Sequence, residues 1–395
     1  NILNFERDYP QAKVIRLEQN YRSAGTILQA ANAIAKCNTK RREKRLWTDK
    51  EDGDLLEFHY LENEFREADF IVHTIQREKL NFGDVAIFYR TNAQARALEE
   101  AFRKSRIPYQ VFGGVKFYSR EEIKNALAYL RLLVNPDDEE SLLRVINFPK
   151  RSIGQKTMER IQQLATHYLL PLLEIVKRVS EFPELHRAQR GITQFSELLQ
   201  RLQQAMPKMD LEEFVNFVLM ESGLFRHYQE KDEENRLENI DSFLNGVHHF
   251  VEEFRKGNYI GEAEEIVNEE DINYEIAEPT LDDFLQNVAL QSDIDDLPED
   301  ASFVSLMTIH NAKGLEYPVV FIAGCEKGLL PHFSAVKEGN EEEERRVFYV
   351  AVTRAEEKLY LTAAQTRFIF GEKRPTVQSD FLQEIPEQLI QLDFH

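Results

Sequence analysis

Three short segments of this chain carry side chains that could bind phosphate groups. They run from Leu17 to Ser23, from Met307 to Phe321 and from Tyr349 to Lys358. The first contains Arg22 and the third contains Arg354. An arginine that reaches the terminal phosphate of a nucleotide stabilises the charge of the transition state, an effect of about 10³–10⁵ in rate where it has been tested in GTPases. Taken singly, each arginine is more readily explained as a surface ion pair.

Polar side chains also follow two apolar runs that predict buried strands. Thr308 and His310 come at the end of one run, and Thr91 and Asn92 come after the other. In an α/β sheet, the ligand crevice lies at the carboxyl ends of the strands. Single-stranded nucleic acid is held there by phosphate contacts and aromatic stacking. These four side chains are therefore candidates for such contacts, although His310 could also be a buried, hydrogen-bonded histidine.

A basic turn at 150–157 leads into a predicted helix. Its Gly154 precedes the helix, and Arg151 and Lys156 add positive charge. Free backbone N–H groups at a helix N-terminus bind phosphate, so the turn is a candidate contact for duplex DNA. An ordinary capped helix start is the alternative.

The sequence predicts only half of a nucleotide site. No segment matches GxxxxGK[ST], and Gly113 to Lys116 lacks the spacing to enclose phosphates. No apolar strand ends in paired carboxylates that could hold magnesium, because the acidic triplets 137–139 and 232–234 stand in polar surroundings. We expect the phosphate loop and the magnesium ligands to lie outside this chain.

The elements that must position these residues follow two different patterns. Near the two ends of the chain, strand and helix patterns alternate, which predicts a parallel sheet covered by helices. The predicted strands are 55–60, 84–89, 302–308, 318–323 and 358–362; the predicted helices are 65–77, 94–104, 341–354 and one through Thr26 to Ala31, capped by Ser23.

The middle of the chain has long amphipathic helical stretches and almost no strand pattern. They are 121–134, 157–179, 191–205, 211–221 and 236–254. We therefore expect an α/β domain made of residues 1–120 and 298–395, interrupted by an all-helical insertion at 121–297.

The net charge of −20 is unusual for a phosphate-binding protein. Residues 262–300 hold fifteen Asp or Glu and no Lys or Arg, so all other residues sum to only −5. We interpret this stretch as a solvated acidic surface. Basic side chains cluster elsewhere, for example at 40–45.

Composition also limits the cellular context. The two cysteines, Cys37 and Cys325, form no CxxC or Cys/His cluster, so we expect no disulfide framework, no metal site and a reducing cytoplasm. No apolar run approaches the roughly 18 residues of a membrane-spanning helix, so we expect no membrane partner. The chain begins at Asn1 without a signal region, which favours a fragment of a longer polypeptide.

Together the three segments resemble the fourth, fifth and sixth motifs of the UvrD/Rep/PcrA-type superfamily 1 DNA helicases. The resemblance extends from Tyr21 to about Pro386 and is strongest in 1–120 and 300–386. It implies that the α/β domain is RecA-like and is the second of two such domains. It also implies that the complete enzyme hydrolyses ATP with Mg²⁺ between them and moves 3′ to 5′ on single-stranded DNA.

The resemblance assigns roles to individual residues on the nucleotide side. Arg22 and Arg354 match the arginines that sense the γ-phosphate. Tyr21 resembles the aromatic residue that stacks on adenine. Gly314 and Glu316 fall in the motif whose glutamate reaches the ribose.

On the DNA side, the resemblance places Thr91, Asn92, Thr308 and His310 on the single strand. Phe370 matches an aromatic residue that packs against a base, although core packing is a strong alternative for one of 27 phenylalanines. The family's Gly-Ile-Gly turn, which touches double-stranded DNA, corresponds to residues Ile153, Gly154, Lys156 and Thr157, with Ser152 in place of the first glycine.

The implied partners are single-stranded DNA, junctions of single and double strands, the missing N-terminal RecA-like domain and repair or replication proteins. Two alternatives remain open. The first is a stand-alone DNA-binding or protein-docking module without a motor half. The second is a nuclease-fused relative of the AddA or RecB kind, although no clustered nuclease residues occur before the chain ends.

Overall fold

The computed structural model describes residues 9, 11, 17–39, 46–257, 278–292, 302–369 and 372–394. The chain divides into two compact units. One, here called the sheet unit, comprises residues 1–116, 297–368 and 372–395; the other, the helical unit, comprises 117–296 with 369–371.

The sheet unit is built on an eight-stranded sheet in the order β3-β4-β2-β5-β6-β1-β8, with β7 paired to β6. Every pairing along that order is parallel, which confirms the predicted parallel sheet. The strands are β1 (Leu56–Asn63), β2 (Val85–Tyr89), β3 (Tyr109–Phe112), β4 (Val304–Thr308), β5 (Tyr317–Ile322), β6 (Ala355–Ile369), β7 (Glu372–Pro375) and β8 (Ile390–Phe394).

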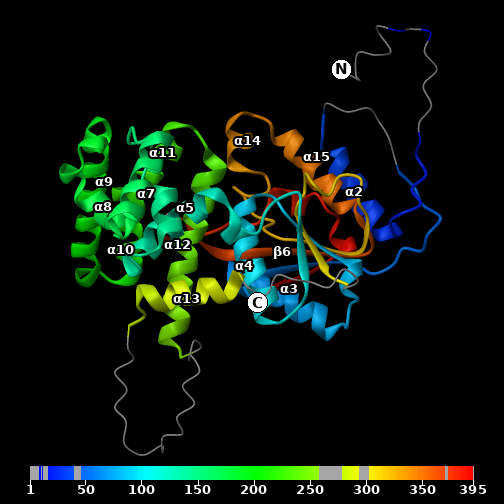
Figure 1. Cartoon of the computed structure of the whole chain (residues 1–395). Helices are drawn as coiled ribbons and strands as arrows, with labels where there is room; N and C mark the ends of the chain where they lie inside the picture. The colour runs from blue at the N-terminus through cyan, green and yellow to red at the C-terminus, as the bar shows by residue number, and fades with distance from the viewer. Residues whose placement is uncertain are drawn as a thin grey trace, which may run out of the picture. The chain divides into compact units, whose positions relative to one another are not determined.

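Both faces of this sheet are covered by helices. In β2, Ala86 and Phe88 face one core, while Ile87 and Tyr89 face the other, because alternate side chains of a strand point to opposite faces. Helices α2 (Gly25–Lys36) and α15 (Glu341–Val352) pack on the first core, and α3 (Glu64–Arg77) and α4 (Ala95–Lys104) pack on the second (Figure 1). Two short helices, α14 (Phe333–Lys337) and α16 (Asp380–Gln383), complete this unit.

The prediction that Ser23 caps α2 is wrong. The helix begins at Gly25 with Ala24 as its N-cap, and no side chain caps it. Backbone carbonyl groups of a distant loop accept its first N–H groups instead: Gly25 N donates to Glu51 O at 2.9 Å and Thr26 N donates to Asp52 O at 2.9 Å. A cap supplied by tertiary structure leaves no local signal in the sequence.

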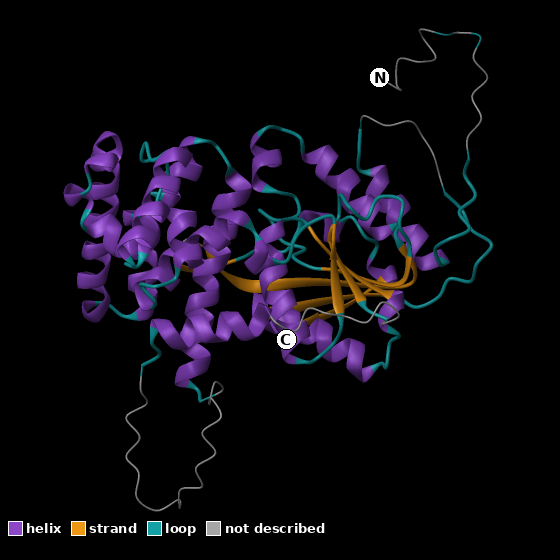
Figure 2. Cartoon of the chain, viewed as in Figure 1, coloured by secondary structure: helices purple, strands orange, loops and turns teal. Residues whose placement is uncertain are grey.

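The helical unit consists of helices (Figure 2). These helices share one hydrophobic core. They are α5 (Glu121–Val134), α6 (Glu139–Val145), α7 (Gln155–Tyr168), α8 (Leu172–Lys177), α9 (Gln189–Ala205), α10 (Leu211–Glu221), α11 (Leu224–Glu230), α12 (Glu234–Arg255) and α13 (Leu281–Ser292). None of the helices in the described ranges is long and apolar enough to cross a membrane.

The single helix predicted for 157–179 is two helices. Helix α7 ends at Tyr168, and Leu169 takes the left-handed conformation at φ 53° that commonly ends a helix. Pro171 then lacks the N–H group that would continue the helix, and α8 begins after it. Strand β6 is also much longer than the predicted 358–362.

Candidate functional site

Two arginines and a glutamate from three segments meet at the amino ends of β5 and β6. Glu316 and Arg354 directly precede these two strands, which are paired through Tyr317 and Ala355. Arg22 Nε donates to Glu316 Oε2 at 2.5 Å. Its Nη1 also donates to a backbone carbonyl beside Arg354, at 3.2 Å. The structure thus brings together residues 294 positions apart in sequence.

Arg354 is held by backbone carbonyl groups. Its Nε donates to Val350 O at 3.1 Å and its Nη1 donates to Leu315 O at 3.1 Å. Burial lowers the pKa of Arg354, and the positive charge of Arg22 lowers it further, against the opposing effect of Glu316. Two guanidinium groups therefore share one nearby carboxylate, which leaves a surplus of positive charge that an anion could neutralise.

The turn that carries Arg22 is shaped by a residue that the sequence analysis missed. The Asn20 side chain accepts the N–H groups of Arg22 at 2.8 Å and Ser23 at 2.9 Å. An Asn two residues before the arginine is the signal of such an Asx turn. The neighbouring Tyr21 is 76% exposed, and its hydroxyl donates to Gln19 Oε1 at 2.6 Å.

Gly314 stands in the turn that leads to Glu316. Its φ of 93° lies in the left-handed region, and nothing lies within 4 Å of a Cβ built there. The glycine is therefore required by the backbone conformation and leaves open space beside it.

The DNA candidates lie at the opposite, carboxyl edge of the sheet. Strands β2 and β4 are neighbours, with Tyr89 paired to Thr308, so the residues that follow both strands lie close together. Asn92 and His310 are exposed there. Thr91 is buried, because it forms a capping box with Gln94.

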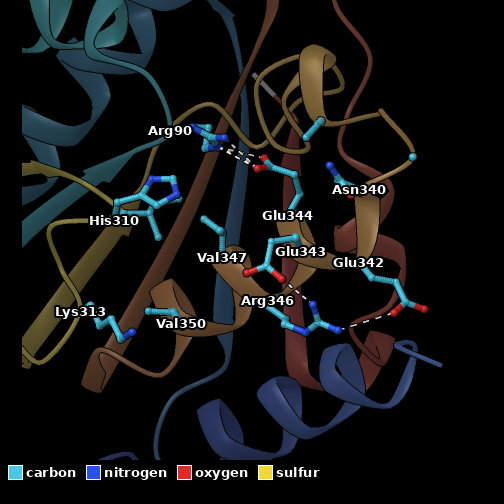
Figure 3. Close-up of a pocket in the computed structure, with 13 residues that line it drawn as sticks. Arg90, His310, Lys313, Asn340, Glu342, Glu343, Glu344, Arg346, Val347 and Val350 are labelled. Carbon is cyan, nitrogen blue, oxygen red and sulfur yellow. Dashed lines mark hydrogen bonds and ion pairs between the residues drawn. The ribbon is translucent and has the colours of Figure 1, made fainter. Parts of the chain in front are cut away.

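A pocket of about 750 Å³ lies beside these residues (Figure 3). His310, Lys313 and Arg90 line it together with Val347 and Val350 of α15. Although His310 is exposed overall, partial burial of its ring lowers its pKa, and the charge of Arg90 lowers it further. An imidazole in this setting is neutral at pH 7. The carboxylates of Glu342, Glu343 and Glu344 line it as well, so acidic side chains oppose the cationic ones.

The segment 309–316 joins the two edges of the sheet. It leaves β4 beside His310 and reaches the amino end of β5 beside Glu316. Ile309 and Ala312 are buried in the core and anchor it against the sheet. The segment is therefore a direct covalent connection between the two edges.

The turn before α7 presents an uncapped helix N-terminus. Gly154 is the N-cap and no side chain caps the helix. Lys156 is exposed, Thr157 is partly exposed and Ile153 is buried, so it anchors the turn. Ser152 takes φ 61°, the conformation that favours glycine.

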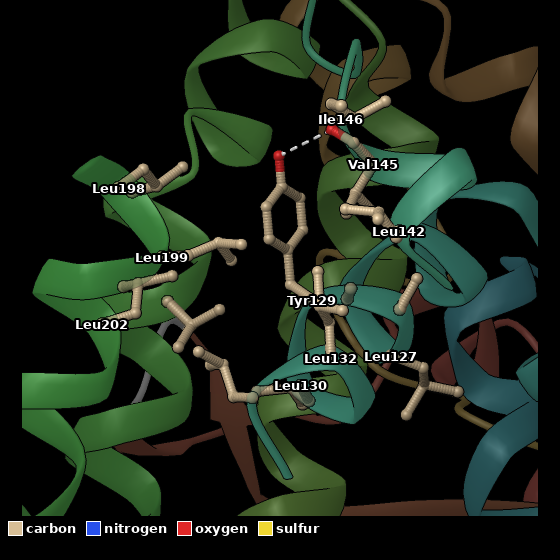
Figure 4. Close-up of a cluster of buried hydrophobic side chains, with 14 of the residues drawn as sticks. Leu127, Tyr129, Leu130, Leu132, Leu142, Val145, Ile146, Leu198, Leu199 and Leu202 are labelled. Carbon is tan, nitrogen blue, oxygen red and sulfur yellow. Dashed lines mark hydrogen bonds between the residues drawn. The ribbon is translucent and has the colours of Figure 1, made fainter. Parts of the chain in front are cut away.

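The guanidinium group of Arg151, which was expected to add positive charge to this turn, binds backbone carbonyl groups and a buried tyrosine of the helical unit. Its Nη1 donates to Val145 O at 3.1 Å and Pro149 O at 3.2 Å, and its Nη2 donates to Tyr129 Oη at 2.9 Å. Tyr129 lies deep among leucines, and burial raises its pKa to about 12 (Figure 4). Arg151 therefore satisfies buried polar groups of the helical unit.

Two remaining expectations concern Phe370 and metal ligands. Phe370 lies outside the described residues, as does the basic cluster 40–45. Within the described ranges, no group of three or more His, Cys, Asp or Glu side chains is placed to hold a metal ion.

A parallel sheet with a helical unit in the middle of its sequence is the architecture implied by the resemblance to superfamily 1 helicases. Comparison with known families agrees with it. The sequence profile of the UvrD-like helicase C-terminal domain matches residues 15–366. The chain therefore belongs to the UvrD-like helicase C-terminal domain family.

Curated relatives with similar sequences carry the name ATP-dependent DNA helicase PcrA. The Staphylococcus epidermidis RP62A protein is 41% identical over 404 residues, which covers 100% of this chain and 52% of the relative. The Staphylococcus aureus MRSA252 protein is 41% identical over 401 residues, which covers 99% and 52%. The chain thus spans about half the length of the curated relatives it matches.

A solved structure described as the C-terminal domain of a possible DNA helicase from Lactobacillus plantarum WCFS1 also matches. It is 11% identical with a TM-score of 0.35, and covers 94% of this chain and 98% of that one. This TM-score is too low to establish a common fold.

Proposed function

We propose that this chain is the C-terminal motor half of an ATP-dependent DNA helicase that moves 3′ to 5′ on single-stranded DNA. The observation that carries the proposal is the convergence of Arg22, Glu316 and Arg354 at one edge of a parallel sheet whose other edge presents Asn92 and His310. The family of the chain and the names of its PcrA relatives support it.

On the nucleotide side, Arg22 and Arg354 bind the γ-phosphate of ATP in this proposal. The cluster fits an anion because its two guanidinium groups share one carboxylate. A phosphate oxygen would compete with Glu316 for Arg22 Nε and would release Glu316 toward the ribose. The open space at Gly314 and the exposed ring of Tyr21 leave room for the nucleoside.

When bound, ATP with magnesium supplies the free energy of hydrolysis. The phosphate loop and the magnesium ligands would come from the N-terminal RecA-like domain. This chain would contribute positive charge, which stabilises the transition state most when it is held in place before the reaction. The backbone contacts of Arg354 provide that preorganisation.

On the DNA side, Asn92, Thr308 and His310 hold the single strand in this proposal. Thr91 would contribute through its capping box, which fixes the turn that presents Asn92. Phe370 would stack on a base. The turn formed by Ile153, Gly154, Lys156 and Thr157 would bind a duplex phosphate through backbone N–H groups and the lysine.

The test of the nucleotide role is Arg354→Ala in the complete enzyme. We expect ssDNA-stimulated ATP turnover to fall by about 10³-fold or more, since a charge is lost from the transition state. Nucleotide affinity, measured with a fluorescent ATP analogue, should change only a few-fold. Arg77→Ala is the matched control, because Arg77 is an exposed arginine at the end of a helix of the same unit. Normal turnover in the Arg354 variant would refute the assigned role.

The half-enzyme proposal is tested by adding the N-terminal half in trans. We expect this chain alone to show no ATPase activity, and the mixture to recover ATPase and unwinding activity. Activity by the chain alone would overturn the proposal. If neither the mixture nor the complete enzyme shows ATPase or unwinding activity, the result would favour a stand-alone DNA-binding or docking module.

A further inference from the structure

Helix α15 contacts both candidate sites through its two ends. Near its C-terminus, Val350 O accepts a hydrogen bond from Arg354 Nε at 3.1 Å. In its first turns, Glu344 forms an ion pair with Arg90, which directly precedes Thr91 and Asn92 at the carboxyl edge of the sheet. Glu344 and Val350 lie six residues apart on this helix, which corresponds to about 9 Å along its axis.

The ion pair between Glu344 and Arg90 has a fixed geometry. Arg90 Nε donates to Glu344 Oε2 at 2.9 Å and Nη2 donates to Oε1 at 2.8 Å, which is a two-point contact (Figure 3). The backbone N–H of His332 also donates to Oε2, at 2.9 Å. The Glu344 side chain is 4% exposed and the Arg90 side chain 19%. A buried pair of this kind specifies position more than it adds stability.

The charge on Glu344 is maintained by these contacts. Burial alone would raise the pKa of this carboxyl group. The hydrogen bonds from Arg90 and from the His332 N–H outweigh burial and lower the pKa. The carboxylate is therefore ionised at neutral pH and always available to Arg90.

Helix α15 is packed firmly enough to move as one body. Phe348, Ala351 and Val352 are buried in the core that it shares with the sheet. Arg345 of α15 donates from Nε to Glu384 Oε1 at 2.8 Å and from Nη1 to Asn38 Oδ1 at 2.8 Å. Close-packed elements transmit displacement instead of absorbing it.

At the other end of the ion pair, Arg90 is coupled to the residues that follow it. The N–H groups of Arg90 and Thr91 both donate to Gln94 Oε1, at 2.9 and 3.0 Å. The same Gln94 belongs to the capping box that fixes the turn at Asn92. A shift of Arg90 therefore carries the whole turn with it.

We propose that Glu344 is a positioning residue that connects Arg90 and the turn at Asn92 to α15. Through this connection, a displacement at Arg354 changes the affinity for single-stranded DNA. The inference rests on the proposed function of the two edges. It assigns Glu344 a role in the coupling between them and no contact with either ligand.

The quantity that tests this role is the coupling between nucleotide and DNA. It is the ratio of the ssDNA dissociation constants of the complete enzyme without nucleotide and with a non-hydrolysable ATP analogue. Couplings of this kind are typically about 5–150-fold. Glu344→Gln keeps the size of the side chain and removes its charge. In this variant we expect the ratio to fall toward one, which is a drop of at least about fivefold if the unmodified enzyme has a ratio of about five or more.

The matched control is Glu341→Gln, the same change one turn earlier on the same helix. Glu341 is about half exposed, and its carboxylate contacts Arg345 at 3.4 Å. We expect the coupling ratio of this variant to stay within about twofold of that of the unmodified enzyme. A change of that size is smaller than a typical coupling of about 5–150-fold. A wild-type ratio in Glu344→Gln would overturn the inference.

Two further outcomes are distinguished by the same measurements. If Glu344→Gln does not fold by circular dichroism, Glu344→Asp, which retains the charge and shortens the reach by one methylene group, is measured instead and should also lose coupling. A purely structural role would lower thermal stability without changing the ratio. If the unmodified enzyme itself shows no coupling, the proposed function fails and the role of Glu344 fails with it.

Discussion

At the scale of single residues, Arg22, Glu316 and Arg354 form a site whose charges are only partly balanced. Glu316 accepts a hydrogen bond from Arg22 Nε and also opposes the charge of Arg354. The positions of the arginines could be predicted from their motifs. The contact partners Leu315 O and Val350 O could not, because backbone carbonyl groups carry no side-chain signal. The Asn20 turn had a local signal, the asparagine itself, and was missed.

His310 provides a pH-dependent test of the DNA site. Its pKa is lowered below 6.5, first by burial and then by Arg90, so the imidazole is neutral at pH 7. Bound phosphate favours the protonated form, so ssDNA affinity should rise as pH falls below about 6.5 through the lowered pKa. We expect the rise between pH 7.5 and 5.5, measured by fluorescence anisotropy in the complete enzyme, to be about fivefold greater than in His310→Gln, as one added charge near a phosphate implies.

The control for this measurement is His73→Gln. His73 is an exposed histidine on α3 and is not among the residues assigned to DNA. Its variant should keep the pH profile of the unmodified enzyme. Identical profiles for the unmodified enzyme and His310→Gln would show that His310 does not contact the strand.

At the scale of elements, much of the fold could be predicted from the sequence. Helices α5 and α10 begin and end at the predicted residues, because their apolar spacing is strong and their ends are marked by acidic or polar residues. Strands β3 and β8 were missed, since both are short edge strands whose pairing is decided by tertiary contact. The break after α7 was also missed, although Pro171 gave a local signal.

The turn before α7 shows how a substitution can preserve a backbone conformation. Ser152 replaces the first glycine of the family's turn, yet it still takes φ 61°. In that conformation a residue with a Cβ is destabilised by about 1–2 kcal/mol of steric strain. Glycine avoids the strain but loses more chain entropy on folding, so replacing serine by glycine recovers only part of that energy. The turn therefore keeps this left-handed conformation at some cost in stability.

Ser152→Gly should stabilise the chain by about 0.5–1 kcal/mol, because glycine adopts this φ without steric strain. The measurement is the free energy of unfolding from urea denaturation followed by circular dichroism. Ser152→Ala is the matched control, since alanine removes the hydroxyl but keeps the Cβ, and it should give no such gain. Equal stability of the glycine and alanine variants would show that the turn is not strained.

At the scale of the whole molecule, the net charge of −20 is compatible with the proposed contacts to DNA. Charges are screened beyond about 8 Å at physiological salt, so the groups beside each phosphate decide the local field. Residues 262–300 account for −15 of the total. The candidate contacts at His310 and Lys156 lie outside that stretch, and each belongs to a different unit.

The last prediction separates the contribution of the helical unit from that of the sheet unit. If the α7 turn binds a duplex phosphate, Lys156→Ala in the complete enzyme should weaken binding to a junction of single and double strands, and leave binding to single strands unchanged. The plot of log affinity against log salt for the junction should lose about 0.9 of its slope, which is the contribution of one phosphate contact on duplex DNA. Lys208→Ala, which removes an exposed lysine elsewhere in the helical unit, should change neither substrate. An equal loss on both substrates would place Lys156 on the single strand, and no loss on either would leave the turn as an ordinary helix start.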